Sequence, residues 1–203
     1  MSKKQEASSS RQGQEALLEV AQRLFTEHGY ANVSMQQIAE EAGMTKGAPY
    51  YYFQNKEALF ARVSVRILSE IRESVMEASA IGGTFQERLI RCILTITRST
   101  TGNLEQWFAD FPRVLSHEDL REIVAEAICA GDLAELLLPR FEEAAEKGEF
   151  TRVSPRTAAS VFQQLLMMKM KDQANANRTA DTPANYLETS TEELVDIFMH
   201  GIR

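Results

Sequence analysis

The segment Ser34–Lys56, SMQQIAEEAGMTKGAPYYYFQNK, decides the expected fold of this 203-residue chain. Ser34 and Gln37 have the S-x-x-Q spacing of a capping box, which predicts that a helix begins here. Gly43 predicts the end of that helix after about two turns, and Thr45 is expected to cap a second short helix. Two short helices joined by a glycine turn are typical of a helix-turn-helix motif.

Longer helices are predicted on both sides of this segment. Upstream, an apolar stripe at helical spacing ends before Gly29 and comprises Leu17, Leu18, Ala21, Leu24 and Phe25. Downstream, Asn55 is expected to cap a helix over residues 56–79. Glycine, serine and proline signals divide the remainder into further helices, and no segment has the alternating pattern of a strand. The sequence therefore predicts an all-α fold.

The second short helix, expected over residues 45–52, would be the recognition helix of the motif. A tyrosine phenol can donate to a phosphate oxygen, and its ring can lie on sugar or on thymine methyl groups. Tyr50 and Tyr51 are therefore the favoured DNA contacts. Tyr52 and Phe53 are expected mainly to pack against the core.

Three more residues of the segment suit close contact with phosphates. Lys46 offers a positive charge, and Gly47 allows the DNA backbone to approach closely. Lys56 places a positive charge near the N-terminus of the next helix, where backbone amides also favour a phosphate. A single lysine is usually just a solvated surface group, so the prediction depends on the whole set.

Charge is distributed in a way that permits specific DNA binding. The net charge of −7 disfavours a nonspecific polyanion binder. The first 57 residues hold six basic and seven acidic side chains, whereas the remainder holds 16 basic and 22 acidic ones. The acidity therefore lies mostly away from the expected DNA-binding end, where a few placed groups would make the phosphate contacts.

Residues 17–59 resemble the DNA-binding domain of the TetR family of bacterial repressors. The resemblance rests on four stretches, AQRLF at 21–25, HGY at 28–30, IAEEAGMTKG at 38–47 and YYYFQNKEAL at 50–59. Together with the chemistry of the side chains, it implies DNA contacts at Ser34, Thr45, Lys46, Gly47, Tyr50, Tyr51 and Lys56.

Two residues depart from the family pattern. Gln14 stands where an arginine is frequent, which would weaken one phosphate contact. Pro49 replaces a larger apolar residue, and it is tolerable in the first turn of a short helix because its missing amide would be unpaired there.

The resemblance also implies how the rest of the chain is organised. The expected parts are a flexible N-terminal arm (1–10), a helix-turn-helix DNA-binding domain (11–55) and a larger helical ligand-binding and dimerisation domain (56–203). Operator DNA, a second copy of the chain and an unidentified small-molecule effector are the expected partners. An inducer would release a homodimeric repressor from a near-palindromic operator.

Two sets of apolar residues are candidates for the later functions. The ligand candidates are Trp107, Phe108, Phe111, Phe141, Phe162 and Met167. The dimerisation candidates are Val161, Leu165, Met168, Leu194, Ile197 and Phe198. Both sets also fit a plain helical core, because aromatic and aliphatic residues at helical spacing are found there most often.

Other classes of protein are disfavoured. The sequence has no Walker loop, no G-x-G-x-x-G and no metal cluster among His28, His117 and His200, so no cofactor or metal is predicted. No apolar run approaches a bilayer span, and a cytoplasmic location without a membrane partner is expected. Cys92 and Cys129 are expected to be buried thiols. The alternatives are a redox-responsive regulator, a helical protein-interaction module and, least favoured, an enzyme.

Overall fold

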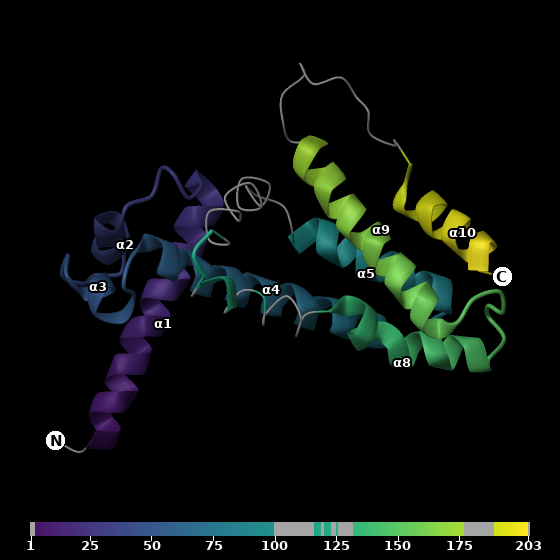
Figure 1. Cartoon of the computed structure of the whole chain (residues 1–203), viewed down its shortest axis with the longest axis horizontal. Coiled ribbons are helices and arrows are strands. Elements are labelled where there is room, and N and C mark those ends of the chain that lie inside the picture. Colours follow the sequence, from purple (N-terminus) through teal and green to yellow (C-terminus); the bar gives the residue numbers. More distant parts are fainter. Residues whose placement is uncertain are drawn as a thin grey trace. The chain divides into compact units, whose positions relative to one another are not determined.

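The computed structural model describes residues 3–99, 116–118, 120–122, 125, 132–176 and 189–202, and all its regular structure there is helical (Figure 1). The chain is divided into two compact units. The first comprises residues 1–68 with the described residues between 116 and 125, and the second comprises residues 69–101 and 129–203. The expectation of an all-α fold is confirmed.

Up to residue 68, the described part of the first unit contains three complete helices and the beginning of a fourth. They are α1 (Lys3–His28), α2 (Met35–Glu41), α3 (Ala48–Tyr52) and the first half of α4 (Lys56–Ala80). Gly29 and Gly43 follow α1 and α2 with positive φ angles of 77° and 67°, the left-handed conformation in which glycine commonly ends a helix. The predicted helix-turn-helix is therefore present.

The caps of the two short helices differ in part from the expectation. Ser34 Oγ accepts a hydrogen bond from the Gln37 amide at 3.1 Å, which confirms the predicted start of α2. Thr45 does not cap α3, because the N-cap is Gly47 and no side chain caps this helix. Pro49 stands in the first turn and has no amide to donate, which removes one of the hydrogen bonds that a cap would make.

Apolar side chains from α1, α2 and α4, with Phe53 directly after α3, form the core of the first unit. Phe25, Tyr30 and Phe60 bring their rings together, with centroids 5.0–5.8 Å apart. Other buried side chains of this core include Leu17, Ala21, Leu24, Met35, Ile38, Ala39, Phe53, Leu59 and Val63. Since Phe60 lies against Phe25 of α1, the beginning of α4 belongs to the first unit.

The second unit is built from the end of α4 with α5 (Phe85–Ser99), α8 (Leu133–Glu146), α9 (Pro155–Ala176) and α10 (Thr191–Ile202). Helix α9 packs against α5 and α8, and α10 packs against α5 (Figure 1). Thr84, Ser154 and Ser190 accept amide hydrogen bonds at the starts of α5, α9 and α10, as their positions predict.

The structure divides the chain into compact units, and the expected functional bounds after residues 10 and 55 stay a prediction. Residues 3–10 belong to α1 and are helical, where a separate arm was predicted. Lysine, glutamine, glutamate and alanine are good helix formers, so this polar stretch continues the helix. The boundary between the compact units falls within α4 after Leu68, because the core of the first unit includes Leu59, Phe60 and Val63. The flexibility of the arm stays a prediction.

Candidate nucleic-acid interface

Helix α3 presents two large aromatic side chains to solvent. Tyr50 and Tyr51 expose 59% and 78% of their surfaces, although both are large and partly apolar. Pro49 is buried beneath them and Tyr52 is half-buried. The five-residue helix therefore turns Pro49 inward and directs both tyrosines outward, so the phenols are available to a phosphate or a base edge.

The residues that flank α3 extend this surface. Thr45, Lys46 and Gly47 are exposed in the turn that precedes the helix. Ser34 is exposed at the start of α2, where its hydroxyl caps the helix. All seven predicted DNA contacts thus belong to the first unit, and six of them are exposed there.

Lys56 is the half-buried member of the set. Its Nζ lies 4.0 Å from the centroid of the Tyr30 ring, which is a cation–π arrangement. Asn55 Oδ1 accepts a hydrogen bond from the Ala58 amide at 2.7 Å and caps the beginning of α4. A lysine at this capped N-terminus adds its charge to the positive end of the helix dipole, where a phosphate is favoured.

Tyr30 also hydrogen-bonds to the neighbour of Lys56. The Tyr30 hydroxyl donates to Glu57 Oε1 at 2.6 Å. This hydrogen bond is the largest cause that holds the pKa of Glu57 below its usual range, although partial burial opposes it. The loop after α1 is therefore joined to the first turn of α4.

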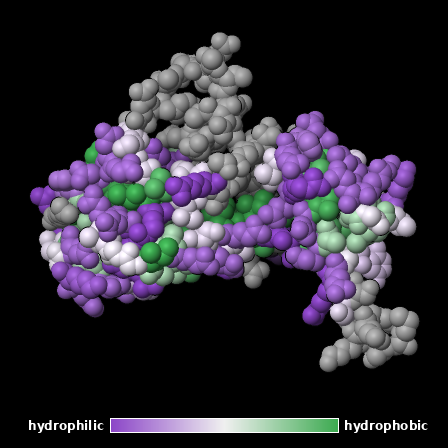
Figure 2. Space-filling model, turned by 180° about the vertical axis from the view of Figure 1, so that it is seen from behind, coloured by the Kyte–Doolittle hydropathy of each residue, from purple (hydrophilic) through white to green (hydrophobic). Residues whose placement is uncertain are grey.

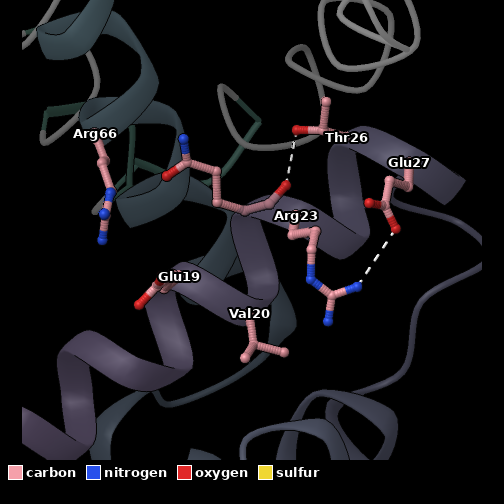
Figure 3. Close-up of a pocket in the computed structure, with 7 residues that line it drawn as sticks. Glu19, Val20, Arg23, Thr26, Glu27 and Arg66 are labelled. Carbon is pink, nitrogen blue, oxygen red and sulfur yellow. Dashed lines mark hydrogen bonds and ion pairs between the residues drawn. The ribbon is translucent and has the colours of Figure 1, made fainter.

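Arg23 connects α1 to α2. Its guanidinium pairs with Glu41 of α2 and, at 3.4 Å, with Glu27 of α1. The hydrogen bond between Arg23 and Glu41 raises the pKa of Arg23 and lowers the pKa of Glu41. Figure 3 shows these α1 side chains along a groove whose lining residues are Glu19, Val20, Gln22, Arg23, Thr26, Glu27 and Arg66. Arg23 in this groove also pairs with Glu41 of α2, so this arginine suits a role in holding α1 and α2 together.

The described ligand candidates belong to the second unit, where two are buried and one is exposed. Phe141 and Phe162 are fully buried and belong to an aromatic cluster, with ring centroids 5.9 Å apart. The other members of this cluster are Phe85, Phe150 and Phe198. Met167 exposes 38% of its surface, and Trp107, Phe108 and Phe111 lie outside the described residues. Phe141 and Phe162 thus serve as core in this structure, and their ligand role stays a prediction.

The dimerisation candidates divide into two groups. Val161 on α9 and Ile197 on α10 expose 45% and 66% of their surfaces. Leu165 and Met168 are half-buried, whereas Leu194 and Phe198 are buried within their own unit. The exposed members keep the properties expected of an interface between copies.

Neither the cysteine thiol nor the potential metal ligands among the described residues indicate a further site. Burial raises the pKa of the Cys92 thiol to about 12, which disfavours the reactive thiolate. Cys129 lies outside the described residues. In the part of the chain that the structure describes, no group of three or more His, Cys, Asp or Glu residues could hold a metal ion. No helix in that part is long and apolar enough to cross a membrane.

Three contacts in the first unit were not predicted from the sequence. They are the Arg23–Glu41 pair, the Tyr30–Glu57 hydrogen bond and the close approach of Tyr52 to Gly13. The first two join residues 18 and 27 positions apart, for which the sequence offers no local signal. Gly13 offers one, because an isolated glycine inside a helix is unfavourable unless packing requires it.

Comparison with known proteins points to the segment that contains the candidate DNA contacts. Residues 17–63 match the family model described as bacterial regulatory proteins, tetR family. The chain is 40% identical over 77 residues to the HTH-type transcriptional regulator AcrR of Shigella flexneri, a match that covers 38% of this chain and 34% of that protein. It is 34% identical over 61 residues to the HTH-type transcriptional repressor AcnR of Corynebacterium efficiens, covering 30% and 32%. The similarity thus spans about a third of each relative.

The whole fold is also similar to solved structures. A transcriptional regulator of the TetR/AcrR family from Thermobifida fusca matches with a TM-score of 0.61 and 24% sequence identity. The match covers 92% of this chain and 94% of that one, so the similarity extends beyond the helix-turn-helix to the second unit. At this identity the likeness concerns the fold.

Proposed function

The chain belongs to the TetR family of bacterial regulatory proteins, and we propose on that premise that it is a homodimeric repressor of transcription. It binds a near-palindromic operator and is released by a small molecule. The DNA-binding part of this proposal rests on the exposed side chains of Tyr50 and Tyr51 on the short helix α3. Lys46 lies before that helix and Lys56 lies after it. The relative AcnR is named a repressor, which supports repression over activation.

Exposed apolar residues on the last two helices support the dimer. Val161 and Met167 on α9 and Ile197 on α10 expose between 38% and 66% of their surfaces. Figure 2 shows a mainly hydrophilic face on which hydrophobic side chains reach the surface in separate patches. A second copy that covers the exposed side chains of α9 and α10 removes apolar area from water. A twofold dimer presents two recognition helices to successive major grooves, about one helical turn of DNA apart.

Release by a small molecule follows from a difference in affinity between two states. An inducer that binds one conformation more tightly shifts the protein towards it, and in that conformation the recognition helices no longer match the spacing of the operator. Helix α4 supports this coupling because its residues belong to both compact units. The effector class stays open, since Phe141 and Phe162 lie in the aromatic core.

Selection of bound DNA tests the proposal. The 203-residue chain is incubated with sheared DNA of its host genome above the salt concentration at which nonspecific binding persists, and the retained fragments are sequenced. We expect enrichment of a short near-palindromic sequence bound by two chains or a multiple of two. The genes beside it then indicate the class of inducer.

The Lys56→Ala variant supplies the matched comparison. It should bind all sequences more weakly and reduce the slope of log affinity against log salt by about one. Lys147→Ala, which alters an exposed lysine of the second unit, should leave both quantities unchanged. If wild type and Lys56→Ala both retained the same random fragments without enrichment of any sequence, a specific operator contact by this surface would be refuted.

A further inference from the structure

Helix α1 leaves room for the recognition helix at Gly13. A Cβ atom added to this glycine would lie 2.6 Å from the Tyr52 hydroxyl oxygen and 3.2 Å from Tyr52 Cζ. Both distances are shorter than van der Waals contact allows. Gly13 lies within the helical span Lys3–His28, and it is not among the glycines with positive φ. Its backbone conformation therefore suits any L-residue other than proline, and the space taken by Tyr52 is the physical reason for a glycine.

Tyr52 connects this position to the exposed surface of α3. Its ring meets the ring of Tyr51 edge to face, with centroids 4.9 Å apart and an angle of 89° between the planes. On its other side it lies 6.5 Å from the ring of the buried Phe53. Tyr52 thus lies between the backbone of α1 and a side chain that exposes 78% of its surface.

Helix α3 depends on such contacts for its position. It has five residues, no side-chain cap, and Pro49 as its one buried residue. So short a helix is not stable by its own hydrogen bonds, and its orientation follows from what it packs against. The approach of Tyr52 to α1 is therefore one of the contacts that can hold α3 and the Tyr51 ring in place, beside the packing of α3 against α2.

We propose that Gly13 and Tyr52 are positioning residues for DNA recognition. The missing side chain at Gly13 lets the Tyr52 ring lie against α1, and that ring holds α3 and Tyr51 in the orientation that meets DNA. The inference rests on the proposed function, because it takes the surface of α3 as the DNA contact. Neither residue needs to touch DNA for this role.

Gly13→Ala tests the proposal because it separates positioning from folding. Alanine is the better helix former, so α1 itself is not weakened. The new Cβ nevertheless displaces the Tyr52 ring. Operator affinity should fall roughly threefold to tenfold, the range that corresponds to forcing one side chain away from its preferred conformation. Binding is measured by fluorescence anisotropy with a duplex that carries the selected operator.

The Tyr52→Phe background supplies the decisive comparison. Phenylalanine lacks the hydroxyl that the new Cβ would meet at 2.6 Å. Phenylalanine keeps Cζ, which the Cβ would meet at the milder distance of 3.2 Å, so Gly13→Ala should reduce affinity in this background by clearly less than beside tyrosine. An equal loss in both backgrounds, or no loss in either, overturns the proposal. Gly82→Ala is the control, since a Cβ there meets no atom within 4 Å, and it should change neither affinity nor the thermal midpoint.

A second variant keeps the proposal testable if Gly13→Ala fails to fold. Tyr52→Leu removes the ring without adding atoms at α1, and it should also weaken operator binding at least threefold or so. Unchanged affinity in this folded variant overturns the proposal. Failure of the proposed function is distinguishable, because the wild-type protein would then bind no operator. If the wild type and Lys56→Ala behave as expected while the Gly13 and Tyr52 variants bind like wild type, the positioning role alone is wrong.

Discussion

At the scale of single residues, Tyr51 has the clearest expected role. It exposes 78% of its surface on α3, and its ring contacts Tyr52. Tyr51→Ala should reduce operator binding by about 1–3 kcal/mol, the usual magnitude of a good specific contact. Anisotropy titrations with the operator and with a scrambled duplex measure the effect. Ile81→Ala removes an apolar side chain of the second unit that is 57% exposed, and it should bind like wild type. A loss of equal size on both duplexes would speak against a sequence-specific contact.

Cys92 is the residue that bears on redox control. Its thiol is buried, its Sγ lies 3.8 Å from the Val75 carbonyl oxygen, and burial raises its pKa to about 12. In a Cys129→Ser variant, Cys92 should therefore react with a thiol reagent only when the protein unfolds. The reaction is followed by absorbance in native buffer and in denaturant. Rapid native reaction, together with a change in operator affinity after oxidation, would restore the redox-responsive alternative.

At the scale of elements, Arg91 holds the turn between α4 and α5. Its Nη2 donates to the carbonyl oxygens of Ile81 and Gly82 at 2.8 and 2.9 Å, and its Nε donates to that of Ala78 at 3.3 Å. Arg91→Ala should lower the free energy of unfolding by about 1–3 kcal/mol. The substitution removes the charged group that donates hydrogen bonds to three backbone carbonyls at and just after the end of α4. Urea unfolding measures the loss.

Arg156 is the matched control for Arg91. It pairs with Glu135, and its side chain is 65% exposed, so the pair should contribute less than about 1 kcal/mol. Equal losses for Arg91→Ala and Arg156→Ala would show that the turn does not depend on the three carbonyl contacts.

The hydrogen bond from Tyr30 to Glu57 joins the loop after α1 to α4 and makes stability depend on pH. A carboxyl whose pKa is lower in the folded state stabilises the fold above its unfolded pKa, and this contribution is lost as the pH falls through the folded value. The pKa of Glu57 is lowered, chiefly by Tyr30. Tyr30→Phe should therefore be less stable than wild type at about pH 7, and the difference should shrink towards about pH 3. Urea unfolding across this range checks the sign, and a pH-independent difference would contradict it.

At the scale of the whole molecule, the proposed dimer predicts that the state of assembly depends on the exposed faces of α9 and α10. Ile197 exposes 66% of its surface. Ile197→Glu should yield a particle with the single-chain mass of 22.8 kDa where the wild type has twice that mass, because a buried unpaired charge opposes association. Light scattering after size exclusion measures the mass. Ile81→Glu, at a site 57% exposed, should stay dimeric, and a dimeric Ile197→Glu would place the interface elsewhere.

The sequence by itself determined the helices and the surface of the recognition helix. Ser34 and Asn55 cap α2 and α4, and Gly43 ends α2, because these signals act between residues within about four positions. The same local rules placed Tyr50 and Tyr51 outward. They failed at Thr45, where Gly47 caps α3 instead and Pro49 withholds an amide.

The tertiary structure alone decided which distant residues meet. It placed Phe141 and Phe162 in an aromatic core, joined Arg23 to Glu41, and seated Tyr52 against Gly13. None of these contacts has a local signature that names its partner, because each depends on how whole helices pack. The sequence therefore determined which side chains α3 offers, and packing against α1 decides how they are held.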